Sequence, residues 1–109
     1  IVDDSVVRGT TSRQIVQMAR EAGALKVSFA SASPPVRFPN VYGIDMPTRE
    51  ELIASDKSEE EIRKALQADY LVFQDLESMI SDVKSFNSKL NGLESSCFDG
   101  KYLTGDVLF

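Results

Sequence analysis

The sequence contains no histidine and no tryptophan, and Cys97 is its single cysteine among 109 residues. Without histidine the chain lacks the most common metal ligand and the most common general base of enzymes, so a serine–histidine or cysteine–histidine catalytic pair within it is excluded. One cysteine permits no internal disulfide and no multi-cysteine metal site. Any metal that this chain holds by itself therefore takes oxygen ligands, which favours Mg²⁺.

Other absences bear on the partners of the chain. No apolar run approaches the roughly 20 residues of a membrane-spanning helix, and no stretch has the pattern of a secretory signal. The net charge of −5 argues against nucleic acid as a partner, because nucleic acid selects basic surfaces. The apolar fraction of 42% is ordinary for a globular protein, and the length allows at most one small domain. The composition thus indicates one folded domain with neither membrane nor nucleic acid as a partner.

Hydrophobic patterning predicts alternating strands and helices. Strands are expected at residues 1–2, 26–31 and 70–74, with a short one at 41–44; helices are expected at 11–22 and 76–86 and, shorter, from 48 and from 58. Apolar strands separated by helices predict an α/β fold, in which a parallel sheet is flanked by helices.

Local signals predict the ends of these helices. Capping-box patterns, with Ser or Thr followed three residues later by Glu or Gln, occur at residues 11–14, 48–51 and 58–61. Asp75 is expected to cap the last helix, and Gly23 to end the first one in a left-handed conformation.

The remaining segments give weaker signals. The continuous apolar run at 70–74 predicts a strand buried on both faces, and the helix that follows is expected to turn its apolar residues, Leu76, Met79, Ile80 and Val83, inward. Residues 32–47 contain all four prolines and predict a long irregular connection. The Asp99-Gly100 pair between two short apolar runs predicts a hairpin.

The first eleven residues carry the strongest functional signal. Ile1-Val2 is followed by the acidic pair Asp3-Asp4, a short loop with Gly9, two threonines and the start of a helix. Carboxylates at a strand end suit sugar hydroxyls or a hydrated Mg²⁺, while the turn and the positive end of the helix offer N–H groups to a phosphate. A ribose with a 5′-phosphate needs all of these groups at once. The plainer alternative is a solvated strand end followed by a helix cap.

These residues resemble the phosphoribosylpyrophosphate-binding signature of the type I phosphoribosyltransferases. Further stretches are similar to the glutamine phosphoribosylpyrophosphate amidotransferase family: residues 18–24, 30–35, 40–47, 74–76 and 97–102. The similarity covers essentially the whole chain. It implies a partial type I phosphoribosyltransferase fold, which is Rossmann-like.

The resemblance also implies an activity. In this glycosyltransferase family, ammonia released from glutamine by an N-terminal glutaminase displaces pyrophosphate from phosphoribosylpyrophosphate. The product is phosphoribosylamine, in the first committed step of purine synthesis. Further implications are a Mg²⁺ cofactor, a cytoplasmic location, a homo-oligomeric parent protein, and AMP and GMP as feedback inhibitors that compete for the same phosphate cradle.

Roles for individual residues follow from the same resemblance. Asp3 and Asp4 are the candidate catalytic residues, which bind the ribose hydroxyls and Mg²⁺ and place negative charge beside the reacting sugar. The candidate cradle of the 5′-phosphate consists of Val7, Arg8, Gly9, Thr10 and Thr11, with Val7 and Arg8 contributing mainly backbone and Arg8 also a candidate source of positive charge. Ser5 stays open between a phosphate donor and a turn residue. For residues 34–37, Tyr42 and Asp45 a packed loop is favoured over a role in the site, and Cys97 is expected not to be a nucleophile.

One branch of the family resembles an iron–sulfur protein. Its cluster cysteines correspond to positions near Asn40, Glu94 and Cys97, of which only the last is a cysteine here. A lone thiolate cannot hold such a cluster, so the resemblance implies the cluster-free branch.

A buried strand at the start and the lack of an initiator Met lead us to expect the C-terminal piece of a larger protein. The glutaminase domain and the first part of the transferase domain would then be absent. We expect such a piece to be inactive alone, and to self-associate through exposed strand edges.

Two alternative functions stay open. One is another type I phosphoribosyltransferase with a nucleobase as the nucleophile, against which residues 40–47 and the C-terminal segment argue. The other is a non-catalytic nucleotide-binding regulator with the same fold, which an adjacent DNA-binding segment would favour.

Overall fold

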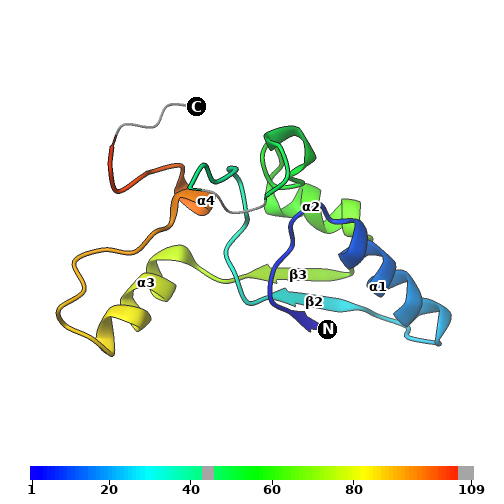
Figure 1. The fold of residues 1–109 in the computed structure, drawn as a ribbon. Helices are drawn as coiled ribbons and strands as arrows, with labels where there is room; N and C mark the ends of the chain where they lie inside the picture. Colours follow the sequence, from blue (N-terminus) through cyan, green and yellow to red (C-terminus); the bar gives the residue numbers. More distant parts are fainter. Residues whose placement is uncertain (43–45, 106–109) are drawn as a thin grey trace.

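The computed structural model describes residues 1–42 and 46–105 (Figure 1). Its elements are, in chain order, β1 (Val2–Asp3), α1 (Thr10–Glu21), β2 (Ser28–Ser31), the 3₁₀ turn η1 (Arg49–Glu51), α2 (Glu59–Leu66), β3 (Tyr70–Phe73), α3 (Leu76–Ser85) and α4 (Ser96–Asp99). Within the described residues, no helix is long and apolar enough to cross a membrane.

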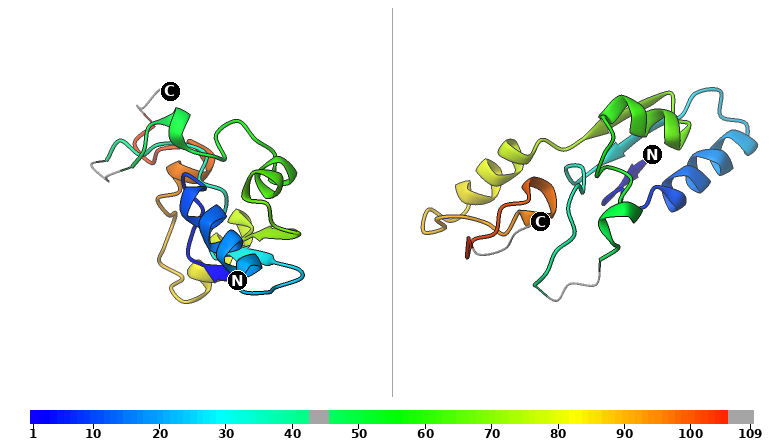
Figure 2. Two further views of the ribbon diagram at one scale, coloured as in Figure 1. Left: turned by 90° about the vertical axis from the view of Figure 1, so that its right-hand side faces the viewer. Right: turned by 90° about the horizontal axis from the view of Figure 1, so that it is seen from above.

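The strands form one parallel sheet with the order β1-β2-β3. Val2 pairs with Ala30, and Ala30 pairs with Val72. The helices α1 and α2 connect successive strands and lie on the same side of the sheet (Figures 1 and 2). The predicted parallel α/β architecture is therefore confirmed, and the carboxyl ends of all three strands meet at one edge.

The core lies between the sheet and these two helices. Val16 of α1 and Ile62 and Leu66 of α2 pack with Val27 and Phe29, and each of these side chains is at most 3% exposed. The period of the apolar residues in α2 and in the segment around β2 predicted this packing, since each element presents one apolar face.

The opposite face of the sheet is open in the described part of the chain, and here one prediction is wrong. Residues 70–74 were expected to be buried on both faces, but Tyr70 is 64% and Val72 is 47% exposed. Leu71 and Phe73 pack on the core instead. The reason is tertiary, because both covering helices lie on the same side (Figure 1).

The start of α1 also differs from its prediction. The helix begins at Thr10 with Gly9 as the N-cap, and no side chain caps it, so the capping box at residues 11–14 is wrong. Gly9 has φ +84°, a left-handed conformation that glycine adopts at little cost. The chain therefore enters the helix one residue early, and Thr11 lies inside its first turn.

The C-terminal end of α1 is as predicted. Gly23 has φ +107°, its N–H donates to the Arg20 carbonyl (3.0 Å), and the next N–H, of Ala24, donates to the Ala19 carbonyl (3.1 Å). These two bonds form a Schellman motif, which satisfies carbonyls that the helix itself leaves without partners.

The capping box of α2 is confirmed in both halves. The Glu61 N–H donates to Ser58 Oγ, and the Ser58 N–H donates to Glu61 Oε1, each over 3.2 Å. The hydrogen bond from the Ser58 backbone and, next to it, the one with the Ser58 side chain lower the pKa of the Glu61 carboxyl.

We expect Ser58→Ala to lower the free energy of unfolding by about 1 kcal/mol, because an N–H at the start of α2 loses its acceptor. Urea unfolding at neutral pH measures the change. Ser81→Ala, on an exposed position inside α3, is the matched control and should leave the midpoint nearly unchanged. Equal midpoints for both variants would show that the capping box contributes nothing.

The remaining segments depart from their predictions in several ways. Instead of a capped helix, residues 49–51 form the 3₁₀ turn η1, which has no side-chain cap, and α4 replaces the predicted hairpin around Asp99-Gly100. Of the short strand expected at 41–44, residues 41 and 42 are irregular and the rest lies outside the described residues.

The last long helix, α3, is capped as predicted, since the Ser78 N–H donates to Asp75 Oδ2 (2.9 Å). Its expected burial is wrong in part. No residue of α3 is fully buried, and Val83 is 41% exposed. The helix lies beyond the carboxyl end of β3 rather than on the sheet (Figure 1), so the sheet does not cover its apolar face.

Candidate functional site

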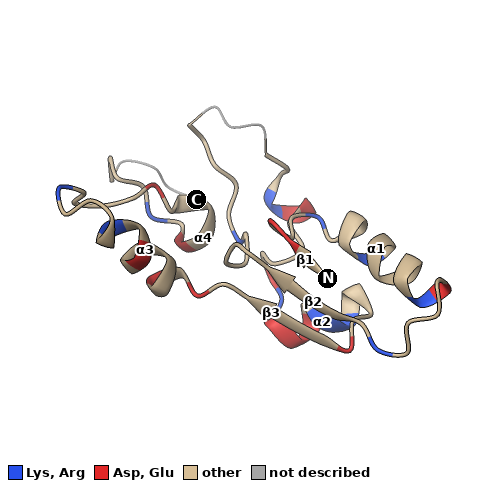
Figure 3. Ribbon diagram, turned by 90° about the horizontal axis from the view of Figure 1, so that it is seen from below, with Lys and Arg blue, Asp and Glu red and all other residues tan. Residues whose placement is uncertain are grey.

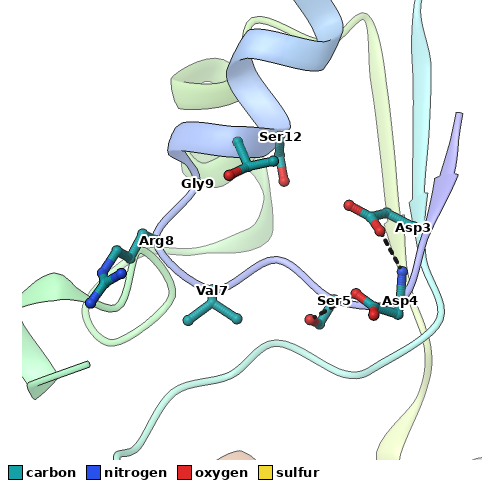
Figure 4. Close-up of a pocket in the computed structure, with 8 residues that line it drawn as sticks. Asp3, Asp4, Ser5, Val7, Arg8, Gly9 and Ser12 are labelled. Carbon is teal, nitrogen blue, oxygen red and sulfur yellow. Dashed lines mark hydrogen bonds between the residues drawn. The ribbon is translucent and has the colours of Figure 1, made fainter. Parts of the chain in front are cut away.

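The candidate site lies where β1 ends and α1 begins (Figure 4). A cavity of about 360 Å³ is lined there by Asp3, Asp4, Ser5, Val7, Arg8, Gly9, Thr11 and Ser12. Every lining residue comes from one run of ten in the sequence, because the chain turns sharply between strand and helix. This is the carboxyl edge of a parallel sheet, where ligands of such folds bind.

The two carboxylates lie at the strand end. The Asp3 carbonyl accepts the Ala32 N–H (2.9 Å), which ties this point to the neighbouring strand. Asp3 Oδ1 accepts the Asp4 N–H (2.8 Å), and Asp4 Oδ1 accepts the Ser5 hydroxyl (3.2 Å). In Figure 4 the Asp3 carboxylate points to the side on which α1 begins, and the Asp4 carboxylate lies beside Ser5. Neither forms an ion pair within the described residues, so both keep acceptor oxygens for a ligand or a hydrated cation.

The start of α1 supplies donors to the same cavity. The first bond inside the helix runs from the Arg13 N–H to the Gly9 carbonyl (2.9 Å). The four N–H groups of residues 9–12 therefore have no partner within the helix. The helix dipole adds partial positive charge at this end. Unpaired N–H groups and a helix N-terminus next to a cavity suit a phosphate.

The loop between strand and helix is fixed from behind. The Val6 side chain is 1% exposed and belongs to the core, and the Val7 carbonyl accepts the Ile53 N–H (3.0 Å). The Arg8 guanidinium points away from the acidic pair (Figure 4), and its Nε donates to Glu51 Oε2 (3.1 Å). A hydrogen bond from Thr48 and, after it, the Arg8 charge lower the pKa of the Glu51 carboxyl.

The predicted site residues are largely brought together. Asp3, Asp4, Val7, Arg8, Gly9 and Thr11 all line the cavity, and so does Ser5, which the sequence left open. Thr10 is exposed and instead lines a smaller cavity with Arg13 and Ile53. The sequence missed Ser12, which is 3% exposed on the wall of the main cavity. The position of Ser12 in the first helical turn could have indicated that it lines the site. The prediction of Thr11 as the cap placed the start of the helix elsewhere, so Ser12 was not considered.

The two carboxylates fit a Mg²⁺ ion that is completed by other ligands. Within residues 1–42 and 46–105, no group of three or more acidic, cysteine or histidine side chains is placed to hold a metal. Mg²⁺ usually keeps several waters and binds through one or two carboxylates together with oxygens of the substrate. Asp3 and Asp4 meet this requirement, whereas a closed metal cage formed by side chains alone would not fit here.

Residues 34–37 do not line this cavity. Pro34, Pro35 and Arg37 line a separate one of about 400 Å³ near the end of β3. Arg37 donates through one guanidinium nitrogen to the carbonyls of Ala54 (2.8 Å) and Lys57 (3.0 Å), which is a packing role. Asp45 lies outside the described residues.

A second polar region joins residues 38–42 to the C-terminal segment. Asn40 Nδ2 donates to Ser96 Oγ (2.9 Å) and to Glu94 Oε1 (3.4 Å). The ring of Tyr42 meets that of Tyr102 edge-on at 4.8 Å.

Burial raises the pKa of the Cys97 thiol, which opposes a nucleophilic role at neutral pH. That the protein holds no iron–sulfur cluster stays a prediction.

A parallel sheet with an acidic strand end and a phosphate-suited helix start at its carboxyl edge is part of a type I phosphoribosyltransferase fold. Within this class, the chain is similar over nearly its whole length to amidophosphoribosyltransferases. It is 56% identical to that of Pseudomonas aeruginosa and 57% identical to that of Escherichia coli, each over 107 residues, and 50% identical over 105 residues to that of Bacillus subtilis. The resemblance drawn from the sequence is thereby confirmed. No family model matches the chain.

Solved structures agree with the sequence comparison. The glutamine phosphoribosylpyrophosphate amidotransferase of Bacillus subtilis, complexed with ADP and GMP, matches 94% of this chain with a TM-score of 0.79 and 49% identity. The match covers 23% of that structure, and the chain spans about a fifth of the length of the Pseudomonas and Escherichia relatives (21% each). The likeness therefore concerns one part of those enzymes.

Proposed function

We propose that this chain is the ribose-5-phosphate-binding part of an amidophosphoribosyltransferase. The reaction joins glutamine-derived ammonia to C1 of phosphoribosylpyrophosphate and gives 5-phosphoribosylamine. It is the first committed step of purine synthesis and takes place in the cytoplasm. One observation carries the proposal: the acidic pair borders the same cavity as Gly9, Thr11 and Ser12, whose N–H groups have no partner within the helix. The identity of about half of all residues to amidophosphoribosyltransferases supports it.

In the proposed reaction a C1–N bond forms to ammonia while the bond from C1 to the pyrophosphate oxygen breaks. The carboxylates of Asp3 and Asp4 accept hydrogen bonds from the ribose 2′- and 3′-hydroxyls and hold the ring. Their negative charge lies beside a sugar that becomes positively charged as pyrophosphate leaves, which stabilises the transition state. A Mg²⁺ ion bound by these carboxylates would neutralise charge on the departing pyrophosphate.

The 5′-phosphate end of the ligand is held by the other side of the cavity. The N–H groups at the start of α1 donate to its oxygens, and Thr11 and Ser12, which carry hydroxyls, line the cavity. Purine nucleotides carry the same ribose 5-phosphate, so AMP and GMP are proposed to compete for this cradle. The complex of the Bacillus subtilis enzyme with ADP and GMP is consistent with nucleotide binding in this family.

The two alternative functions are not favoured, because the relatives of this chain are amidophosphoribosyltransferases. The described cavity binds the ribose phosphate half of the substrate and has no group assigned to pyrophosphate. We therefore propose that the 109-residue chain binds the ligand but does not turn it over.

Isothermal titration calorimetry tests this proposal. With Mg²⁺ present, the chain should bind ribose 5-phosphate with an affinity of about millimolar or better. Ribose, which lacks the phosphate, should bind at least tenfold more weakly, and no ammonia-dependent phosphoribosylamine should form. Equal affinity for ribose and ribose 5-phosphate would contradict the assignment of the cradle, and detectable turnover would contradict the inactivity of the chain.

A further inference from the structure

Residues 51–53, at the end of η1 and just after it, support the loop that joins β1 to α1. This loop is called the phosphate loop below. Figure 3 shows η1, with its charged residues, beside the segment that joins β1 to α1. From the structure we infer that Glu51 and Ile53 are positioning residues for ribose-phosphate binding. We also infer that the Arg8 side chain anchors the loop to Glu51 instead of contacting the phosphate. The inference rests on the proposed function and deepens it.

Three contacts join residues 51–53 to three consecutive loop residues. The Ile53 N–H donates to the Val7 carbonyl (3.0 Å), and Glu51 pairs with Arg8 (3.1 Å). The Ile53 side chain lies so close to Gly9 that a Cβ there would be 2.5 Å from Ile53 Cδ1. One segment, more than 40 residues away in the sequence, thus contacts Val7, Arg8 and Gly9 in turn.

The segment itself is held in place, so it serves as a support. Leu52 and Ala54 are each 1% exposed, and the Ala54 carbonyl accepts from Arg37 (2.8 Å). The Thr48 hydroxyl donates to Glu51 Oε1 (3.1 Å), while Arg8 occupies the other oxygen of that carboxylate. Both oxygens of Glu51 are therefore engaged, and its orientation is fixed.

The direction of the Arg8 side chain decides its role. The guanidinium extends from the loop toward η1, away from Asp3, Asp4 and Ser12 (Figure 4). A ligand phosphate at the start of α1 meets the backbone of residues 9–12, while Arg8 holds that backbone in place. A loop fixed before binding loses less conformational freedom when the ligand arrives, which raises affinity.

Exchange of the two charges tests this inference. In the 109-residue chain we expect R8Q and E51Q each to weaken the binding of ribose 5-phosphate roughly two- to fivefold, the range of one exposed ion pair. The double variant Arg8→Glu with Glu51→Arg should regain most of the lost affinity, because the pair forms again in reverse. Had Arg8 touched the phosphate, a carboxylate in its place would repel the ligand, and binding would fall further.

The control is Glu50→Gln, which removes an exposed carboxylate next to Glu51 that has no partner within the described residues; it should leave affinity unchanged. Thermal midpoints show that each variant is folded. If the exchanged variant does not fold, the single variants decide: similar losses for R8Q and E51Q support the inference. A much larger loss for R8Q, or tighter binding by E51Q, overturns it. Absence of binding by the unmodified chain overturns the proposed function and this inference with it.

Discussion

Replacing Gly9 with alanine is expected to weaken the binding of ribose 5-phosphate at least tenfold and to lower the free energy of unfolding by about 1–2 kcal/mol. Gly9 has φ +84°, where a residue with a Cβ is strained by about this amount. The new Cβ would also meet Ile53 Cδ1 at 2.5 Å. The Ile53 side chain can shift away, but the loop backbone then moves with it, and the N–H groups of residues 9–12 lose their common direction.

Gly23→Ala is the matched control for this prediction. Gly23 also has a left-handed backbone, with φ +107°, but nothing lies within 4 Å of an added Cβ. The control should therefore lose a similar amount of stability and keep its affinity for the ligand. Chemical denaturation and calorimetry on both variants separate the two effects. A parallel loss of affinity in both would mean that the effect of Gly9 is one of general stability.

Removing charge from the acidic pair is expected to have the largest effect on the sugar end of the site. Asp3→Asn and Asp4→Asn should each weaken Mg²⁺-dependent binding of ribose 5-phosphate about tenfold, and together about a hundredfold. Each tenfold step corresponds to about 1.4 kcal/mol, close to the lower limit for a hydrogen bond to a charged group. Folding should be nearly unaffected, since the asparagine side chain has the same shape and Asp4 is exposed.

This prediction is tested by measuring the affinity for ribose 5-phosphate with and without Mg²⁺. Both variants should lose most of the gain in affinity that Mg²⁺ confers on the unmodified chain. Asp82→Asn, on an exposed position of α3, provides the control for the loss of one negative charge at a distance from the cavity. If Mg²⁺ raised the affinity of the double variant as much as that of the unmodified chain, Asp3 and Asp4 would not be ligands of the metal.

The candidate site was predictable because it is local in sequence. Every residue that lines the cavity lies between Asp3 and Ser12, so the order of acids, glycine and hydroxyls already described it. The error concerned the cap: the pattern favoured Thr11, but Gly9 caps the helix. A capping box is a statistical preference of short segments, and Gly9 can adopt the left-handed conformation that begins the helix earlier.

Two predictions that depended on residues distant in the sequence were wrong. Val72 and Tyr70 form an apolar strand together with Leu71 and Phe73, yet one face of β3 is uncovered in the described chain. The Asp99-Gly100 pair ends the short helix α4, with Gly100 as its C-cap, instead of forming a hairpin. In each case the local pattern was compatible with two structures, and packing against other segments selected one.

The sequence by itself determined the alternation of strands and helices, the parallel sheet and most of the residues at its carboxyl edge. Each of these depends on periodicity or on groups a few residues apart, which short-range sterics and hydrogen bonds control. Only the tertiary structure decided that Glu51 and Ile53 support the phosphate loop. Pairings such as Arg8 with Glu51 join residues 43 apart in the chain, and no local rule specifies which distant segment folds against a given loop.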